Sequence, residues 1–315
     1  MKLFGTAVVG LAMVTSCVVG GPIASISPVG TNVASELEES GGNYEGDIIL
    51  SPEQEDAVKH GYTAIIAESY KWPNNLVPYA IDTTAFTAAQ RNSIVSALEQ
   101  IELVSCVRFK ARTTEKDYVM VTGAYTGCSA QLGHQGGGMQ TVNLQPNGCM
   151  SRGTIIHEFL HALGFVHMQS ATDREFFITV NWSNISAGKS SNFNYLSSDK
   201  IEDFGIPYDY DSVMHYSRTA FSANGLDTIT PKQPGVTIGQ RVGLSYKDIK
   251  RLNFRYPICY KTTGKGSREQ SGSGSLLILI TYPAHNTNQT QSESGPLVPL
   301  INAIQGRCSL QIPER

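Results

Sequence analysis

Apolar and polar residues alternate in several short stretches in the middle of the chain, and these stretches predict β-strands. The first of them runs from Leu76 to Ile81 and contains Pro78. Because proline has no backbone N–H to donate, Pro78 indicates an edge position for this strand. Further strands are predicted at residues 107–109, 118–122 and 140–144.

Helices are predicted where apolar residues recur at helical spacing behind a capping residue. They are expected over residues 53–60, 88–103 and 151–163, and from residue 244 onward. Ser51, Thr87 and Ser245 are the predicted N-caps. Because strands dominate early and helices later, the α+β fold class is favoured.

Residues 1–20 have the pattern of a signal peptide: Lys2 supplies the positive charge, and an apolar run follows from Leu3 to Val19. The alternatives are a buried N-terminal helix and a membrane anchor. An anchor is disfavoured because glycine, serine and threonine interrupt the run and no stop-transfer charges follow it. The sequence therefore predicts a secreted, extracellular protein without a stable membrane anchor.

Changes in composition divide the rest of the chain into three parts. Residues 21–62 are expected to be a propeptide, in which the stretch from Ser25 to Asn43 lacks periodicity and indicates poor intrinsic order. Residues 63–260 have the pattern of a globular domain. Residues 261–315 are predicted to be a mostly disordered tail, whose apolar run at 276–280 is far shorter than a membrane span.

The overall composition narrows the possible partners. Of the 315 residues 41% are hydrophobic and 16% are charged, with a net charge of -3. This is enough apolar material for a core, but it provides no basic face for nucleic acid. Partners are therefore to be inferred from the chemistry of the site, and the oligomeric state stays open.

The cysteines agree with an exported chain. Cys17 would leave with the signal peptide, and Cys308 is left over in the tail, either free or joined to another molecule. An even number in the central region indicates two disulfides, for which three pairings are possible, among Cys106, Cys128, Cys149 and Cys259. Three glycosylation sequons fit the same export route: Asn181, Asn184 and Asn288.

Metal-ligating residues concentrate in one segment, His-Glu-Phe-Leu-His-Ala-Leu-Gly-Phe-Val-His from residue 157 to 167. His157 and His161 are four residues apart, so on a helix both rings point from one face toward a common ion. Zinc accepts histidine nitrogen, and a catalytic zinc site keeps three protein ligands and one open position. Glu158 is placed to take a proton from the water at that position, as a general base.

The third ligand requires a bend in the chain. In a continuous helix His167 would lie about 15 Å beyond His157, out of reach of the same ion. Gly164 can adopt a positive φ, which ends the helix and turns His167 back toward the metal. Three neutral histidines leave the zinc ion its full charge, which favours acidification of its water and polarisation of a peptide carbonyl.

Two other interpretations of these histidines are available. They could be ordinary core or surface residues of an amphipathic helix, but three His, one Glu and one Gly at fixed positions rarely coincide by chance. They could hold a structural zinc ion, but such a site is normally closed by a fourth protein ligand, often Cys, and none lies in this segment.

A second segment, Ser-Val-Met-His-Tyr at residues 212–216, fits the same site. Met214 would form an apolar floor under the ligands, which is physically close to an ordinary core methionine. The Tyr216 hydroxyl would bind the metal or donate to a developing oxyanion, although a buried structural tyrosine is the plainer alternative. His215 is not expected to be a ligand, since three are already present.

These two segments together resemble the astacin family of zinc metalloproteases, within the metzincins. The similarity covers roughly residues 44–259, and the extended zinc motif and the turn at 212–216 carry its specificity. Further matches are Lys-Trp-Pro at 71–73, Cys-Val-Arg-Phe at 106–109 and Gly-Gln-Arg at 239–241.

The resemblance implies an α+β metzincin-type fold of two subdomains: a twisted, mostly antiparallel-edged N-terminal sheet with two long helices, and an irregular C-terminal subdomain. It also implies Cys106–Cys259 and Cys128–Cys149 disulfides and Tyr216 as a fifth zinc ligand. Substrate would lie along the edge strand near 128–131. Arg241 resembles the basic residue of the pocket after the scissile bond, which implies a preference for acidic side chains; a surface salt bridge is the alternative.

The propeptide also resembles the family. Tyr44-Glu45-Gly46-Asp47 is similar to its aromatic-x-Gly-Asp segment, in which the Asp carboxylate takes the place of the zinc-bound water. The resemblance therefore implies that Asp47 is the inhibitory zinc ligand of a zymogen. One departure stands out: after His167 the family usually has Glu and, three residues on, Arg, whereas this chain has Met168 and Ala171.

The sequence therefore predicts a secreted endopeptidase, made as a zymogen, that binds one zinc ion per subunit and hydrolyses protein or peptide substrates. Glu158 would act first as base and then as acid to the leaving amine. A catalytically inactive binding domain that keeps zinc for stability is the main alternative, supported by Met168 and Ala171. Another metzincin branch is the second, and it should lack Tyr216 and the 44–47 segment.

Overall fold

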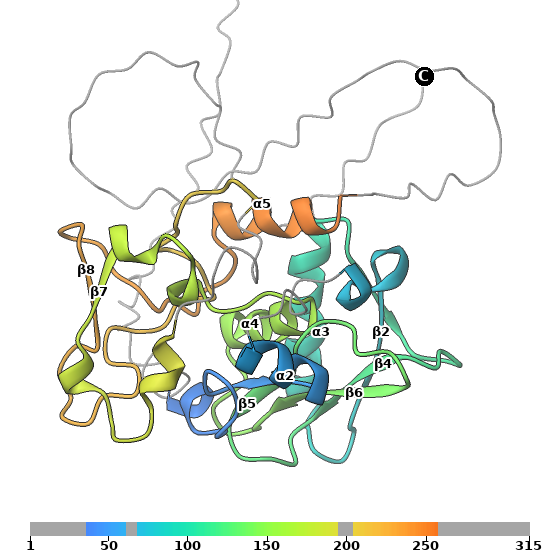
Figure 1. Cartoon of the computed structure of the whole chain (residues 1–315). Coiled ribbons are helices and arrows are strands. Elements are labelled where there is room, and N and C mark those ends of the chain that lie inside the picture. Colours follow the sequence, from blue (N-terminus) through green and yellow to red (C-terminus); the bar gives the residue numbers. More distant parts are fainter. Residues whose placement is uncertain (1–35, 61–67, 195–203, 258–315) are drawn as a thin grey trace, which may run out of the picture. The chain divides into compact units, whose positions relative to one another are not determined.

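A six-stranded sheet and two helices that share its hydrophobic core form the main body of the computed structural model, which describes residues 36–60, 68–194 and 204–257 (Figure 1). The strands follow the order β1-β5-β6-β4-β2-β3 across the sheet. Every neighbouring pair is parallel except β5 and β6, which are antiparallel. The strands are β1 (Ile48–Ile49), β2 (Leu76–Ile81), β3 (Arg108–Ala111), β4 (Tyr118–Thr122), β5 (Cys128–Gln131) and β6 (Met139–Leu144).

The longer α-helices of the described chain are α2 (Pro52–His60), α3 (Ala88–Val104), α4 (Arg152–Ala162) and α5 (Tyr246–Arg255). Thr87 caps α3 in a capping box with Gln90, and Ser245 caps α5 in the same way with Asp248. Each box satisfies backbone donors that the first helical turn leaves unpaired. In Figure 1 α5 lies at the top, α4 in the middle and strands β5 and β6 below.

The main hydrophobic core joins the sheet to α3 and α4. Val119, Val121 and Val142 of the sheet are fully buried, as are Ile94 of α3 and Phe159 of α4. Among the described residues, β5 is tied to the chain before α4 by the Cys128–Cys149 disulfide. The core thereby fixes α4 against the sheet along its whole length.

The chain beyond α4 is mostly irregular. It contains a two-stranded antiparallel sheet, β7 (Ile178–Val180) with β8 (Ile229–Pro231), and a separate apolar cluster around Phe193, Tyr216 and Phe221. Short 3₁₀ turns make up much of the rest: η4 (Met168–Ser170), η5 (Arg174–Phe176), η6 (Trp182–Asn184) and η7 (Ser190–Phe193). Before the sheet lie η2 (Glu68–Tyr70) and η3 (Pro73–Asn75).

The expected mixture of helices and strands is confirmed, whereas the division into two subdomains stays a prediction. Strands expected at 76–81 and 118–122 have those bounds, and the other predicted strands and helices differ by one or two residues at their ends. The mostly antiparallel-edged sheet that was expected is not observed, because both edge pairs, β1 with β5 and β3 with β2, are parallel.

The edge position predicted for the strand with Pro78 is wrong, because β2 lies between β4 and β3. The register explains why proline is tolerated there. Pro78 pairs with Lys110 of β3, while the pairing of β2 with β4 begins only at Tyr79. The missing N–H of Pro78 therefore removes no hydrogen bond from the β4 side.

The poor order expected from Ser25 to Asn43 is wrong for its described part, since residues 36–39 are helical. Their order comes from contacts with distant residues, which a local pattern does not reveal. Several predicted features lie outside the described residues: the signal peptide, the boundary between residues 62 and 63, Cys259, Asn288, Cys308 and the 261–315 tail.

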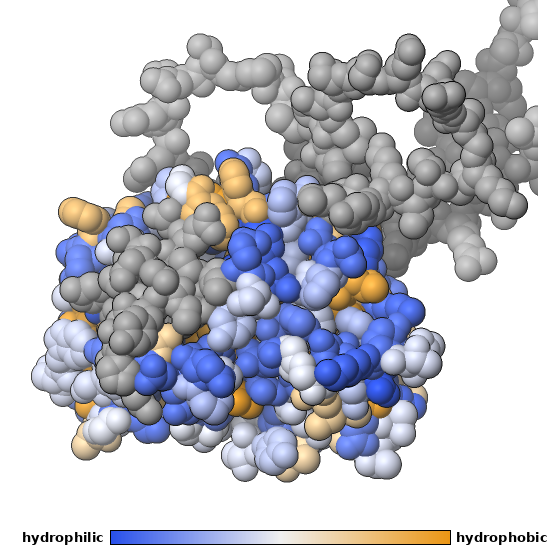
Figure 2. Space-filling view, turned by 45° about the vertical axis from the view of Figure 1, so that its right-hand side comes forward, coloured by the Kyte–Doolittle hydropathy of each residue, from blue (hydrophilic) through white to orange (hydrophobic). Residues whose placement is uncertain are grey.

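The described surface is mostly hydrophilic on the face seen in Figure 2, with apolar side chains in small separate groups. Exposed apolar residues include Leu103, Tyr125, Phe176 and Val242, which belong to different elements. Scattered apolar side chains of this kind are normal for a protein surface. No helix in residues 36–60, 68–194 or 204–257 is both long and apolar enough to cross a membrane.

Candidate metal centre

Helix α4 positions His157 and His161 on one buried face. Its N-terminus is fixed by Ser151, whose hydroxyl accepts a hydrogen bond from the Thr154 amide at 3.1 Å. From Gly153 to Ala162 every residue is buried. The two rings approach so closely that their Nε2 atoms lie 3.1 Å apart.

Gly164 ends α4 and reverses the chain. Its φ is 91°, a left-handed conformation that residues with a Cβ rarely adopt. The Gly164 amide donates to His161 O at 2.8 Å and the Phe165 amide donates to Leu160 O at 3.0 Å, which closes the helix end. A Cβ at Gly164 would lie 2.7 Å from Nη2 of Arg255, so the close packing of Arg255 also favours a residue without a side chain.

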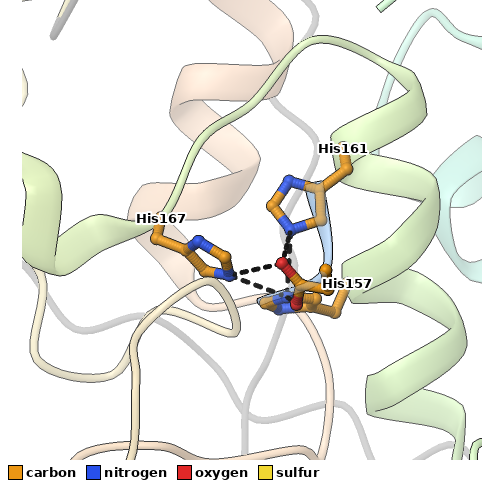
Figure 3. Close-up of side chains that lie close together, drawn as sticks. His157, His161 and His167 are labelled. Atoms are coloured by element: carbon orange, nitrogen blue, oxygen red, sulfur yellow. Dashed lines mark hydrogen bonds and ion pairs between the residues drawn. The ribbon is translucent and has the colours of Figure 1, made fainter. Parts of the chain in front are cut away.

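The reversal brings His167 to the two helix histidines. Its Nε2 lies 3.3 Å from Nε2 of His157. Figure 3 shows the three rings, with a carboxylate between their Nε2 atoms. That carboxylate belongs to Asp47, whose oxygens lie 3.1 Å from His157 Nε2, 3.4 Å from His161 Nε2 and 3.3 Å from His167 Nε2.

The hydrogen-bond partners of the Nδ1 atoms indicate which ring nitrogen of each histidine carries the proton. His157 Nδ1 lies 2.8 Å from Val213 O, His161 Nδ1 lies 2.7 Å from Phe165 O, and His167 Nδ1 lies 2.8 Å from Glu45 Oε2. Because all three partners are acceptors, each Nδ1 carries a proton and donates. Three Nε2 lone pairs then face one another in a buried space, an arrangement that a cation stabilises.

Asp47 completes a set of four buried ligand groups within 4.8 Å of one another. Its Oδ1 is buried without a hydrogen-bond partner among the described residues. Burial raises the pKa of Asp47, but the neighbouring His167 and His161 outweigh it and hold the pKa well below its ordinary value. Three imidazole nitrogens and a carboxylate oxygen are a donor set that fits zinc.

Glu158 lies beside this cluster with both carboxylate oxygens buried and unpaired within the described chain. Burial, followed by the charges of Asp47 and Glu38, raises its pKa well above the ordinary value. Glu158 therefore holds a proton more readily while Asp47 and Glu38 lie beside it. Glu38, His157 and Glu158 also form a second close group of ligand atoms.

Tyr216 lies next to His167, with ring centroids 4.6 Å apart, and its hydroxyl donates to the backbone carbonyl of Glu45. Burial raises the pKa of Tyr216 well above its ordinary value, so the hydroxyl is neutral. Met214 is buried in the main core, and its carbonyl accepts from the Met168 amide at 2.9 Å.

Arg241 is buried and forms an ion pair with Glu38. Its Nε donates to Glu38 Oε1 at 2.8 Å and its Nη2 donates to Oε2 of the same carboxylate. Burial lowers the pKa of Arg241, but Glu38 outweighs this and raises it. The Nη1 group donates to His215 O at 3.1 Å, which ties this pair to the 212–216 segment.

The structure thus brings together His157, His161, His167, Asp47, Glu158 and Tyr216, as the sequence patterns suggested, with Arg241 nearby. Two residues of this site were not found from the sequence: Glu38 and Glu45. Glu45 stands inside the segment that resembles the family motif, so its position was a usable signal. Glu38 lies in a stretch without periodicity and gave none.

The predicted glycosylation residues of the described chain lie side by side. Asn181 Nδ2 donates to Asp227 O at 2.9 Å, and Asn184 Nδ2 donates to the same carbonyl at 2.8 Å. Both residues are half-buried. Attachment of a glycan at either one stays a prediction.

Comparison with known families gives one match that spans most of the described residues. The family model described as Astacin (Peptidase family M12A) matches residues 64–257. The solved structure of High choriolytic enzyme 1, a hatching enzyme zinc-protease from Oryzias latipes, shares 40% identity with a TM-score of 0.55. The alignment covers 59% of this chain and 92% of that one.

Curated relatives show the same similarity. Seminal metalloprotease 1 of Drosophila melanogaster is 40% identical over 225 residues, which are 68% of this chain and 86% of the relative. Zinc metalloproteinase nas-14 of Caenorhabditis elegans is 37% identical over 258 residues, which are 74% of this chain and 51% of the relative. The chain spans about half the length of this relative and of others like it.

Proposed function

The chain belongs to the astacin family of zinc peptidases, and we propose that it is a secreted zinc endopeptidase made as a zymogen. The observation that carries the proposal is the buried meeting of three imidazole Nε2 atoms beside Glu158. Burying three imidazoles and the unpaired Glu158 carboxyl together costs free energy, so this arrangement indicates a functional metal site.

His157, His161 and His167 would hold the zinc ion, which in this kind of site polarises a carbonyl and makes water a stronger acid. Glu158 would accept the proton of the attacking water and deliver it to the leaving amine. For this role Glu158 must be ionised. Departure of Asp47 and Glu38 would remove two nearby negative charges and lower its pKa.

Tyr216 would donate a hydrogen bond to the oxygen of the scissile carbonyl as negative charge develops there. In the zymogen its hydroxyl is occupied by the carbonyl of Glu45. Release of the prosegment would free this donor for the substrate. A role of Tyr216 as a fifth metal ligand belongs to the same proposal.

Asp47 would keep the zymogen inactive by occupying the position that the substrate needs. Its carboxylate lies within 3.4 Å of all three Nε2 atoms. The backbone beside it adds a second obstruction, since β1 pairs with β5 through Ile48 and Ala130. An extended substrate adding to the edge of β5 would have to displace β1.

Arg241 would select substrates with an acidic side chain just after the scissile bond. Support comes from its partner in the zymogen, the Glu38 carboxylate, which is removed with the prosegment. A buried guanidinium that loses its carboxylate is left with an unpaired charge, so an acidic substrate side chain would bind there favourably.

Secretion is part of the proposal and is supported by the signal-like residues 1–20 and by the Cys128–Cys149 disulfide. The domain limits of 1–20, 21–62, 63–260 and 261–315 are proposed with it. Protein or peptide substrates follow from the peptidase family.

The test compares processed wild-type protein with Glu158→Ala on casein, with and without a zinc chelator. Activity should fall at least about 1000-fold in the variant and be abolished by the chelator, because the proton acceptor and the Lewis acid are both required. Equal activity in the two proteins would contradict the role of Glu158. Asp47→Ala in the uncleaved zymogen should release activity, and unchanged latency would contradict the inhibitory role.

One alternative function has an observation in its favour. Met168 and Ala171, which replace the usual Glu and Arg, are buried in the apolar cluster around Phe193 and Tyr216. A catalytically inactive binding domain would tolerate this change. It predicts no casein cleavage by processed wild-type protein even with zinc bound.

A further inference from the structure

We propose that the prosegment, besides blocking the metal centre, helps to hold its zinc ion, because Glu45 orients His167. The uncleaved zymogen should therefore bind zinc more tightly than the processed protein, beyond the contribution of Asp47 as a ligand. The inference rests on the proposed zinc site and on removal of the prosegment.

The three histidines differ in what fixes their outer nitrogen. The Nδ1 groups of His157 and His161 donate to Val213 O and Phe165 O, two backbone carbonyls within the predicted 63–260 domain. These partners stay after cleavage. His167 Nδ1 instead donates to the carboxylate of Glu45, 122 residues earlier in the prosegment, at 2.8 Å.

The Glu45 side chain is held firmly in this position. It is 1% exposed, and its second oxygen accepts from the Ser170 hydroxyl at 2.6 Å. Its backbone carbonyl accepts from Tyr216. The backbone of Glu45 has a φ of 47°, a conformation that costs free energy in a residue with a side chain and persists where surrounding contacts enforce it.

Glycine at position 46 allows the prosegment to fold closely around this residue. A Cβ there would lie 2.7 Å from Glu38 O and 3.0 Å from the ring of Phe221. The chain from Glu38 to Asp47 is thus a compact loop that carries three carboxylates into the site. One carboxylate contacts Arg241, one contacts His167, and one lies between the imidazoles.

A carboxylate on the outer nitrogen of a metal-ligating histidine fixes the ring and makes it a better donor. Loss of such a partner typically lowers metal affinity by 10- to 100-fold. Within the described chain, no catalytic-domain carboxylate contacts His167 Nδ1. The next residue, Met168, has a thioether that carries no charge and does not replace Glu45.

The experiment measures the zinc dissociation constant of the uncleaved protein by competition with a chromophoric chelator. All variants carry Glu158→Gln, which prevents self-processing and keeps peptidase activity out of the readout. Glu45→Gln should weaken zinc binding about 10- to 100-fold. The matched control is Glu39→Gln, a prosegment carboxylate that accepts from the Phe221 amide at 2.8 Å and should change the affinity by less than about 2-fold.

Asp47→Asn separates the two contributions of the prosegment. This change weakens binding by impairing a ligand, and adding Glu45→Gln to it should weaken binding again by a similar factor. Hydrogen exchange over residues 36–60 reports whether the prosegment stays in place in each variant. If Glu45→Gln loosens the prosegment, Ser170→Ala is measured instead. This change removes the hydroxyl that donates to the Glu45 carboxylate, and it should weaken zinc binding about 5-fold.

Equal zinc affinity of the parent, Glu45→Gln and Ser170→Ala would overturn the inference while leaving the zinc peptidase intact. A parent protein that binds no stoichiometric zinc would instead refute the proposed function itself. Processed protein that binds zinc as tightly as the uncleaved Asp47→Asn variant would also contradict a role for Glu45.

Discussion

The chain before Gly164 and the chain after it hold the same three imidazoles by different means. His157 and His161 belong to a capped helix that is buried along its length against a sheet. His167 lies in irregular chain, and its position depends on Gly164, Met214 and Glu45. Regular secondary structure thus fixes two ligands locally, whereas long-range contacts fix the third.

Because of this difference, substitutions on the two sides of the centre should have unequal effects. A change on the helix side is resisted by many apolar contacts, each of modest strength. A change on the loop side removes one of a few polar contacts that have no substitute. Four predictions test this contrast.

The largest effect is expected at the boundary itself. Gly164→Ala places a Cβ at a φ of 91° and 2.7 Å from Arg255 Nη2, so unfolding free energy should fall by about 4 kcal/mol. Urea unfolding and zinc stoichiometry check this. Full zinc content and unchanged stability in the variant would show that the turn needs no glycine.

The second effect concerns residues 212–216, whose backbone contacts both His157 and Met168. The Asp248 carboxylate accepts hydrogen bonds from Ser212 Oγ at 2.6 Å and from the Val213 amide at 2.9 Å, next to the carbonyl that orients His157. Asp248→Ala leaves these buried donors unpaired and should cost about 3 kcal/mol in urea unfolding. Asp248→Asn, which keeps an acceptor, should cost clearly less. If the two variants are equally stable, this support is not important.

The third effect is a pH dependence of the loop side. His215 is buried between the Tyr208 hydroxyl and Tyr216 O, and burial lowers its pKa to about 4. The unfolded chain takes up a proton near pH 6.5, whereas the folded chain does so only near pH 4, so stability is lost as the pH falls through this window. Between pH 7.5 and pH 5 the loss from this residue should be about 2 kcal/mol.

His215→Gln should flatten that part of the stability profile, measured by urea unfolding at both pH values against the parent. Protonation of the zinc ligands is common to both proteins and cancels in the difference. An identical acid loss in parent and variant would exclude His215 as its source.

The smallest effect is expected on the helix side. Ser151→Ala removes the cap of α4 and should cost about 1 kcal/mol. Zinc affinity should stay unchanged, because the helix is held by its burial against the sheet. A marked loss of zinc affinity would mean that the helix side also depends on single polar contacts.

The sequence predicted the parts of the site that local patterns encode. Ser151 and Gly164 bracket a helix that ends within one residue of its predicted limits, and the spacing of His157 and His161 gives their common face. The sequence did not reveal the ion pair between Glu38 and Arg241, because these residues are 203 positions apart in the chain. Nor did Pro78 reveal its strand's place, since strand order depends on pairing partners that local alternation does not encode.

The end of α4 is completed by residues that are synthesised much later than the helix. The Leu163 carbonyl accepts from Arg255 Nε at 3.0 Å and from the Tyr256 hydroxyl at 2.9 Å, residues 92 and 93 positions later. During synthesis the histidine-bearing helix emerges long before the residues that close its terminus. These contacts at the helix end therefore form only after residues 255 and 256 have left the ribosome.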